Sequence, residues 1–159
     1  MEISALHRLF LQAKSISTDS RKVESNSIYF ALSGERFNGN EFALEALRKG
    51  ADYAVVDLIS LKDASRCIFV NDVLKTLQEL GTYHRNYCKA TVISLTGSNG
   101  KTTTKELISR VISRKYRTTA TLGNLNNHIG VPLSLLNIKE DTEFAVIEMG
   151  ANHQNEIEF

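Results

Sequence analysis

The sequence is poor in the features that mark a disulfide framework or a polyanion-binding surface. It has only two cysteines in 159 residues, Cys67 and Cys88, which are far apart and match neither a CxxC pair nor a metal-ligand spacing. We therefore expect free thiols. Nineteen basic and eighteen acidic residues give a net charge of +1 without a basic block. Nucleic acid and anionic membranes are not expected as main partners.

The first fifteen residues lack the pattern of a signal peptide or a membrane span. An acidic residue stands at position 2, and polar residues interrupt the apolar ones. This pattern predicts a cytoplasmic protein with no membrane insertion. The apolar content of 42% is enough to bury a core, in one domain of ordinary size or in two small ones.

Helical and strand patterns alternate along the chain, which indicates an α/β fold in two parts. In the first part we expect helices at 3–13, 41–50 and 72–87, and strands at 27–32, 53–57 and 67–70. In the second part we expect strands at 91–97, 116–121 and 144–150, and helices at 101–114 and from Pro132 to residue 137. A boundary near 86–91 would separate a small α/β domain (1–88) from the start of a P-loop domain with a parallel sheet (89–159).

The segment SLTGSNGKTTT, residues 94–104, predicts a phosphate-binding loop between a strand and a helix. The usual motif is GxxxxGK[ST], and Leu95 stands where its first glycine would be, so this loop is a shortened variant. Its glycines let backbone N–H groups approach phosphate, and the following helix points its positive end at the anion. The expected nucleotide-binding residues are Gly97, Ser98, Asn99, Gly100, Lys101, Thr102 and Thr103. The alternative is a glycine turn before an ordinary helix lysine.

A metal site is expected beside this loop. Thr102 can ligate Mg²⁺ through its hydroxyl, and Lys101 supplies charge for the β- and γ-phosphates of a nucleotide such as ATP. Glu148 ends the apolar strand FAVIE, where a metal-organising carboxylate normally lies. A solvated carboxylate at a strand end is the alternative for Glu148.

Three segments, TGSNGKTTTKE, TLGNLNNHIGVPLSLL and VIEMGANHQNEI, together closely resemble the Mur ligases of peptidoglycan synthesis. The likeness is greatest to the type that joins D-alanyl-D-alanine to a UDP-N-acetylmuramoyl-tripeptide. It also covers STDSRKVESNSIYFALSGERFNGNEFALEALRKGADYAVV, which is similar to the domain that holds the UDP-sugar end of the substrate. The resemblance implies that ATP, with Mg²⁺, phosphorylates a substrate carboxylate, and that the amine of D-alanyl-D-alanine attacks the acyl phosphate.

The resemblance also implies roles for individual residues. Lys101 and Asn127 are implied as catalytic, and Thr102 and Glu148 as metal-binding. The implied substrate-binding residues are Ser17, Thr18, Asp19, Ser20, Arg21, Gly34, Arg36, Asn38, Asn127 and His128. The alternatives are a loop-stabilising Asn127, a structural contact between Asp19 and Arg21, and a solvated hairpin turn at 33–39.

Complete Mur ligases have three domains, so the resemblance implies that this chain is an amino-terminal portion, inactive in ligation as it stands. An incompletely covered sheet predicts self-association, local disorder or shielding by a neighbouring molecule. Three other interpretations stay open: a ligase that adds the third amino acid, a non-catalytic nucleotide-dependent module, and an autonomous UDP-sugar-binding domain.

Overall fold

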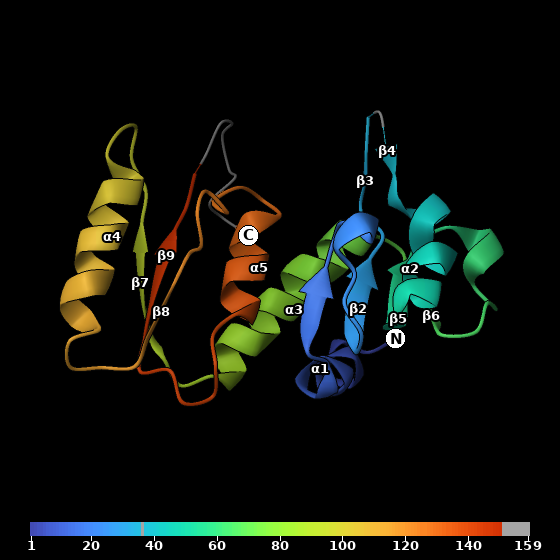
Figure 1. The fold of residues 1–159 in the computed structure, drawn as a ribbon, viewed down its shortest axis with the longest axis horizontal. Coiled ribbons are helices and arrows are strands. Elements are labelled where there is room, and N and C mark those ends of the chain that lie inside the picture. The colour runs from blue at the N-terminus through green and yellow to red at the C-terminus, as the bar shows by residue number, and fades with distance from the viewer. Residues whose placement is uncertain (36, 151–159) are drawn as a thin grey trace. The chain divides into compact units, whose positions relative to one another are not determined.

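The structure is a computed structural model that describes residues 1–35 and 37–150 (Figure 1). The chain divides between Leu77 and Gln78 into two compact units, each with its own sheet. The helix α3 (Val73–Tyr87) contains this division. Parallel strands covered by helices confirm the predicted α/β class.

The first unit contains a four-stranded parallel sheet in the order β1-β2-β5-β6. Its strands are β1 (Ser15–Ser17), β2 (Ser27–Phe30), β5 (Ala51–Val56) and β6 (Cys67–Phe69). Its helices are α1 (Ile3–Gln12), α2 (Ala43–Lys49) and the start of α3, with single 3₁₀ turns at Ser20–Lys22, Gly39–Phe42 and Ile59–Leu61. The strands expected at 27–32, 53–57 and 67–70 are confirmed, whereas β1 was not predicted.

The core of the first unit follows from the composition of β2 and α2. All four residues of β2 are buried, as expected for an inner strand of a parallel sheet. Alanines on one face of α2, Ala43 and Ala46, pack close to the sheet in a cluster with Tyr29 and Ala54. The helix ends at Gly50, whose φ of 119° terminates it as predicted.

A short antiparallel hairpin of β3 (Ser33–Gly34) and β4 (Phe37–Asn38) follows β2. Figure 1 shows it extending beyond the ends of the neighbouring strands. The ring of Phe37 stacks on that of Phe42 at a centroid distance of 5.5 Å. This contact fixes the base of the hairpin against the 3₁₀ turn that leads into α2.

The second unit contains a three-stranded parallel sheet in the order β7-β9-β8. Its strands are β7 (Thr91–Leu95), β8 (Thr118–Ala120) and β9 (Phe144–Glu148), and its helices include α4 (Lys101–Ile112) and α5 (Gly130–Leu136). Figure 1 shows α4 on one face of this sheet and α5 on the other. Four of the five residues of the central strand β9 are therefore buried. All three predicted strands of this part are confirmed.

Two helix starts show how side chains set the limits of the elements. The predicted N-cap of α3 is confirmed, since Asp72 Oδ1 accepts a hydrogen bond from the Lys75 N–H at 2.9 Å. The expectation that a helix begins at Pro132 is wrong, because α5 begins at Gly130. Asn127 Oδ1 accepts from the N–H groups of Ile129 at 3.2 Å and Gly130 at 2.8 Å, so the backbone turns into the helix two residues earlier.

Both cysteines are free thiols, as predicted, with Cys88 buried and Cys67 half-buried. Cys88 lies beside His84, whose Nε2 is 2.7 Å from the carbonyl oxygen of Ile138. Burial lowers the pKa of His84 and raises that of the Cys88 thiol. Both shifts favour the neutral form of the group.

Candidate phosphate and metal site

The predicted phosphate loop connects the end of β7 to the start of α4. Gly97 and Gly100 adopt φ values of 151° and 75°, which side chains rarely tolerate, and no heavy atom lies within 4 Å of a Cβ built on either. The loop is exposed, and the first N–H groups of α4 have no carbonyl partner within the helix. Open space, free N–H groups and the helix dipole suit this loop to an anion.

Lys101 lies over this loop. Its Nζ donates a hydrogen bond to the carbonyl oxygen of Gly97 at 2.6 Å, so the ammonium group is folded back onto the turn. A phosphate cradled by the loop would meet this charge directly. Ser98, Asn99, Thr102 and Thr103 are all exposed on the same loop and first helical turn, in keeping with their predicted contact with a nucleotide.

Glu148 is brought to the same place by the fold. It ends the central strand β9 and is 1% exposed, so the alternative of a solvated carboxylate is wrong. Glu148 Oε1 accepts from Thr102 Oγ1 at 3.1 Å and from Asn126 Nδ2 at 2.8 Å. Glu148 Oε2 is buried and has no hydrogen-bond partner among residues 1–35 and 37–150. A buried carboxylate oxygen without a partner is costly, which points to a positive ligand.

The donor set fits Mg²⁺. This ion takes oxygen ligands, keeps several waters, and is usually bound through one or two carboxylates together with substrate phosphates. Glu148 and Thr102 supply a carboxylate and a hydroxyl at the phosphate loop. Over the described ranges 1–35 and 37–150, no cluster of three or more His, Cys, Asp or Glu side chains could hold a metal by itself. A magnesium ion here would therefore depend on phosphate oxygens as well.

The asparagine beside the carboxylate is Asn126, and sequence reasoning selected its neighbour. Asn127 is exposed and its Oδ1 caps α5, whereas Asn126 contacts Glu148 through its side chain and Gly150 through its carbonyl oxygen, at 2.7 Å. The placement supports a helix-capping role for Asn127. His128 is exposed, and its carbonyl oxygen accepts from Gln78 Nε2. Two adjacent asparagines in a loop offer no sequence signal to separate their roles.

The predicted UDP-sugar residues in the first unit begin with the group after β1. The Asp19 carboxylate accepts hydrogen bonds from the Arg21 N–H at 3.0 Å, from Nε at 2.9 Å and from Nη2 at 2.8 Å. These bonds hold the pKa of Asp19 well below its usual range. Ser17 bonds to the backbone of Asp19, Ser20 is buried, and Thr18 is half-buried. The cluster is thus a closed turn whose exposed arginine already has a carboxylate partner.

The second predicted group lies on the hairpin. Asn38 Oδ1 accepts from Ser33 Oγ and from the backbone and side-chain nitrogens of Asn40, and Asn40 in turn donates to Asp57. Gly34 is exposed with open space around it. The predicted residue Arg36 lies outside the described residues. Asn40 and Asp57, which sequence reasoning missed, therefore anchor the hairpin to the end of β5.

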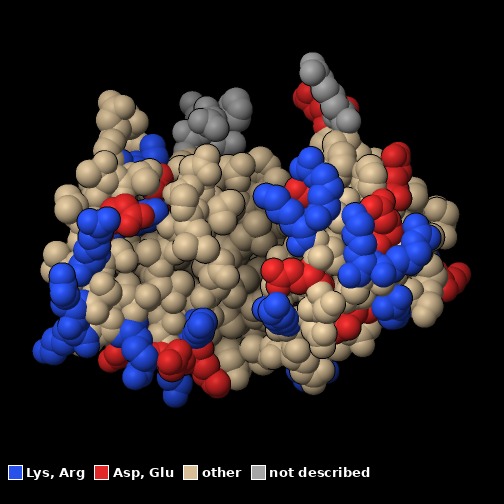
Figure 2. All heavy atoms as spheres, in the orientation of Figure 1, with Lys and Arg blue, Asp and Glu red and all other residues tan. Residues whose placement is uncertain are grey.

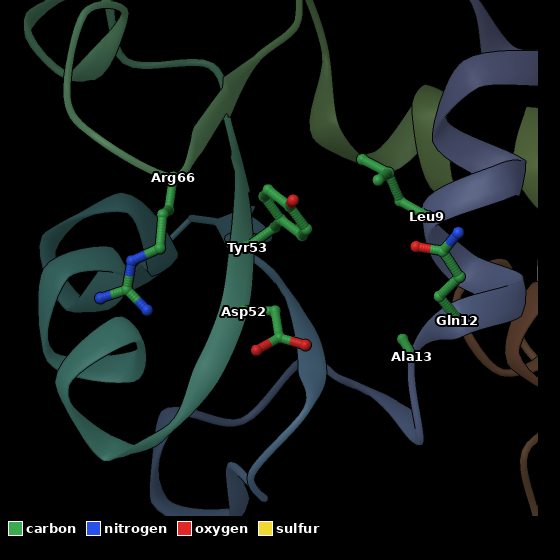
Figure 3. A pocket seen from close by; sticks show the side chains of 6 residues that line it. All are labelled: Leu9, Gln12, Ala13, Asp52, Tyr53 and Arg66. Atoms are coloured by element: carbon green, nitrogen blue, oxygen red, sulfur yellow. The ribbon is translucent and has the colours of Figure 1, made fainter.

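A separate hollow of about 240 Å³ lies in the first unit between α1 and β5. It is lined by Leu9, Gln12, Ala13, Asp52, Tyr53 and Arg66. Figure 3 shows the Arg66 guanidinium turned away from α1, and it donates to the carbonyl oxygens of Ala51 and Leu47. The hollow contains none of the residues expected to bind the UDP-sugar.

The second unit, with its strand, glycine loop, helix and carboxylate at the end of the central strand, defines a P-loop domain. The model of the Mur ligase family catalytic domain matches residues 12–94, and that of the Mur ligase middle domain matches residues 95–159. The chain therefore belongs to the Mur ligase family. The limits 1–88 and 89–159 given above for the domains stay a prediction.

Several relatives carry the same name. The chain is 41% identical over 145 residues to the UDP-N-acetylmuramoyl-tripeptide–D-alanyl-D-alanine ligase of Bacillus subtilis, covering 90% of this chain and 32% of the relative. It is similar to MurF from Acinetobacter baumannii, with a TM-score of 0.86, 39% identity, and coverage of 98% of this chain and 37% of that one. MurF from Thermotoga maritima, solved in complex with ADP, gives a TM-score of 0.82 at 33% identity, covering 93% and 34%.

The chain thus spans about a third of the length of the curated relatives it matches. Among the helices of the described part, none is both long and apolar enough to cross a bilayer. On the face drawn in Figure 2, basic and acidic side chains occur together at several places, and neither sign covers the face alone.

Proposed function

We propose that this chain forms the UDP-sugar-binding part and the phosphate-binding part of an ATP-dependent amide ligase. Its substrates would be a UDP-N-acetylmuramoyl-tripeptide and D-alanyl-D-alanine. The observation that carries the proposal is the buried carboxylate Glu148, which lies against Thr102 at the phosphate loop and has one oxygen without a partner in the described part of the chain. The relatives named for this reaction support the substrate class.

ATP would transfer its γ-phosphoryl group to the tripeptide carboxylate, which forms an acyl phosphate and releases ADP. The amine of D-alanyl-D-alanine would then attack the acyl carbon, forming the amide bond and expelling inorganic phosphate as the amine loses its proton. The residues of the loop have separate tasks. N–H groups from Gly97 to Thr103 would bind phosphate oxygens, and the Lys101 ammonium would leave the Gly97 carbonyl to neutralise charge on the β- and γ-phosphates. Thr102 and Glu148 would hold Mg²⁺, which binds phosphate oxygens and lowers their charge.

The first test is ligation by the full-length protein with ATP, Mg²⁺, UDP-N-acetylmuramoyl-tripeptide and D-alanyl-D-alanine. Formation of the pentapeptide product with release of ADP supports the proposal. A second assay replaces the UDP-N-acetylmuramoyl-tripeptide by its dipeptide precursor and D-alanyl-D-alanine by single amino acids. This substrate panel separates the proposed ligase from one that adds the third amino acid. Nucleotide hydrolysis without product in every combination would contradict the proposal and favour a non-catalytic module.

We also propose that the loops of the first unit bind the UDP end of the substrate without ATP. Arg21 is exposed and could meet a diphosphate, since an arginine can form strong paired hydrogen bonds with phosphate, but it would have to share or leave Asp19. Calorimetry with UDP-N-acetylmuramoyl-tripeptide on wild type and Arg21→Ala tests this role, with Arg48→Ala as a matched surface control. Equal affinity in all three would return Arg21 to a purely structural role.

A further inference from the structure

The most deeply buried charged side chain near the candidate site is Lys105, which the mechanism above does not use. It lies on α4 and is 0% exposed. Its Nζ is 2.7 Å from the carbonyl oxygen of Thr121, 3.0 Å from Glu106 Oε1 and 3.4 Å from the carbonyl oxygen of Gly123. An ammonium group has three donors, and here each has an acceptor. Lys105 is therefore a fully engaged charge and not a free nucleophile or base.

These acceptors place the lysine against the loop that follows β8. Thr121 accepts the shortest of these bonds through its carbonyl oxygen. Its Oγ1 also accepts a hydrogen bond from the Glu148 N–H, at 3.0 Å. The loop then continues to Asn126, whose side chain donates to Glu148 Oε1. Lys105 thus binds the start of the 121–126 segment. In this segment the Thr121 side chain contacts the Glu148 backbone, and the Asn126 side chain contacts the Glu148 carboxylate.

Lys105 lies about one turn along α4 from Thr102. It stands three residues after Thr102, so the two side chains lie on the same face of the helix. Thr102 reaches Glu148 Oε1 directly, and Lys105 holds the 121–123 backbone onto that same helix. The separation between the helix and the loop therefore sets whether Thr102 and Asn126 can contact one carboxylate oxygen together.

We propose that Lys105 is a positioning residue for the magnesium-binding carboxylate. It couples α4 to the 121–126 loop so that Glu148 Oε1 is held by two donors and Glu148 Oε2 is left for the metal. Burying an ammonium group costs desolvation free energy even when it is hydrogen-bonded, so an apolar side chain of similar size could pack here without loss of stability. What the lysine adds is a defined distance between the two elements. This inference rests on the proposed function, because it assigns Mg²⁺ to Glu148.

The test uses Lys105→Met, which keeps the length of the side chain and removes its donors, Lys105→Arg, which keeps charge and donors, and the exposed control Lys115→Met. ADP binding to the full-length protein is measured by calorimetry over a range of MgCl₂ concentrations, beside thermal unfolding of each variant. We expect Lys105→Met to raise the Mg²⁺ concentration for half-maximal ADP binding about tenfold or more. Losing a residue that orients a metal ligand commonly weakens metal binding by this factor. Lys105→Arg should recover part of this loss, and Lys115→Met should match wild type.

If folded Lys105→Met has the Mg²⁺ requirement of wild type, whatever its unfolding temperature, the inference is overturned. If Lys105→Met does not fold, Thr121→Val tests the same coupling, since it removes the hydroxyl that accepts the Glu148 N–H and keeps the carbonyl that Lys105 binds. A Thr121→Val protein with the Mg²⁺ requirement of wild type would equally overturn it. Failure of the full-length wild-type protein to bind ADP with Mg²⁺ at all would instead contradict the proposed function.

Discussion

The adjacent residues Asn126 and Asn127 form hydrogen bonds with different groups, so their alanine variants should have different effects. Asn126→Ala removes the 2.8 Å hydrogen bond to the Glu148 carboxylate, and Asn127→Ala removes the cap of α5. A hydrogen bond to a charged group contributes about 1.5–3 kcal/mol. Loss of an N-cap costs about 1 kcal/mol. Both variants should therefore be less stable than wild type, but only the first should disturb Glu148, the carboxylate proposed to bind the metal.

For a chain of this size, each kcal/mol corresponds to about 2–4 °C in unfolding temperature. We expect Asn127→Ala to lower that temperature by this amount and to bind ADP with the Mg²⁺ requirement of wild type. Asn126→Ala should raise the Mg²⁺ requirement by about tenfold or more, because Glu148 loses the donor that orients it. Circular dichroism gives the first quantity, and calorimetry over a MgCl₂ series gives the second.

The Glu148→Gln variant supplies the reference for this comparison. It removes the anionic ligand, so adding Asn126→Ala to it should change the Mg²⁺ requirement little further, because residues that act through one contact are not additive. A larger Mg²⁺ effect from Asn127→Ala than from Asn126→Ala would refute the reasoning. It would restore Asn127 to the role implied by the family resemblance.

Three further predictions concern the same unit. Lys101→Ala in the full-length ligase should lower turnover about a hundredfold or more with little effect on folding, and ligation near the wild-type rate would remove Lys101 from the site. Burial lowers the pKa of His84 below its ordinary value of 6.5, so at acid pH this residue binds protons more readily in the unfolded chain than in the folded one. As far as His84 determines it, the free energy of unfolding should therefore be highest above pH 6.5 and should decrease as the pH falls. Urea unfolding of wild type and His84→Gln at several pH values checks the sign, since the variant should lose that part of the slope. Gly130→Ala should cost about 1–3 kcal/mol in urea unfolding, because its Cβ would lie 2.4 Å from the Leu125 carbonyl carbon, and unchanged stability would show that this backbone can shift.

Sequence reasoning succeeded where a local pattern decides the local structure. The glycines, lysine and threonines of 97–103 stand between an apolar strand and a helix, and the strand FAVIE leads straight to Glu148, so the proximity of this loop and Glu148 could be predicted from the order of the elements. Asp72 was recognisable as a cap for the same reason. Parallel pairing then brings the ends of β7 and β9 together, with Leu95 opposite Glu148.

The missed features depend on contacts that no local pattern contains. The pattern KTTTKE is typical of a helix with an exposed lysine at position 105. Lys105 is buried because α4 packs on β8 and β9. The choice between Asn126 and Asn127 is set by the path of the loop backbone. β1 and the hairpin strands are three residues or fewer, too short to show an alternation, and their pairing partners define them.

The strand order β7-β9-β8 has a consequence for how the second unit is assembled during synthesis. β9 is the last of the three strands to leave the ribosome, yet it is the one that pairs with both others. Until residues 144–148 emerge, β7 and β8 have no shared partner, and the phosphate loop has no carboxylate beside it. Non-local pairing of this kind is slow and exposes strand edges. We therefore expect the three strands to pair, and Glu148, the carboxylate proposed to bind the metal, to reach the phosphate loop, in a single late step. Proteases should cut within residues 91–120 in nascent chains that are stalled before residue 144.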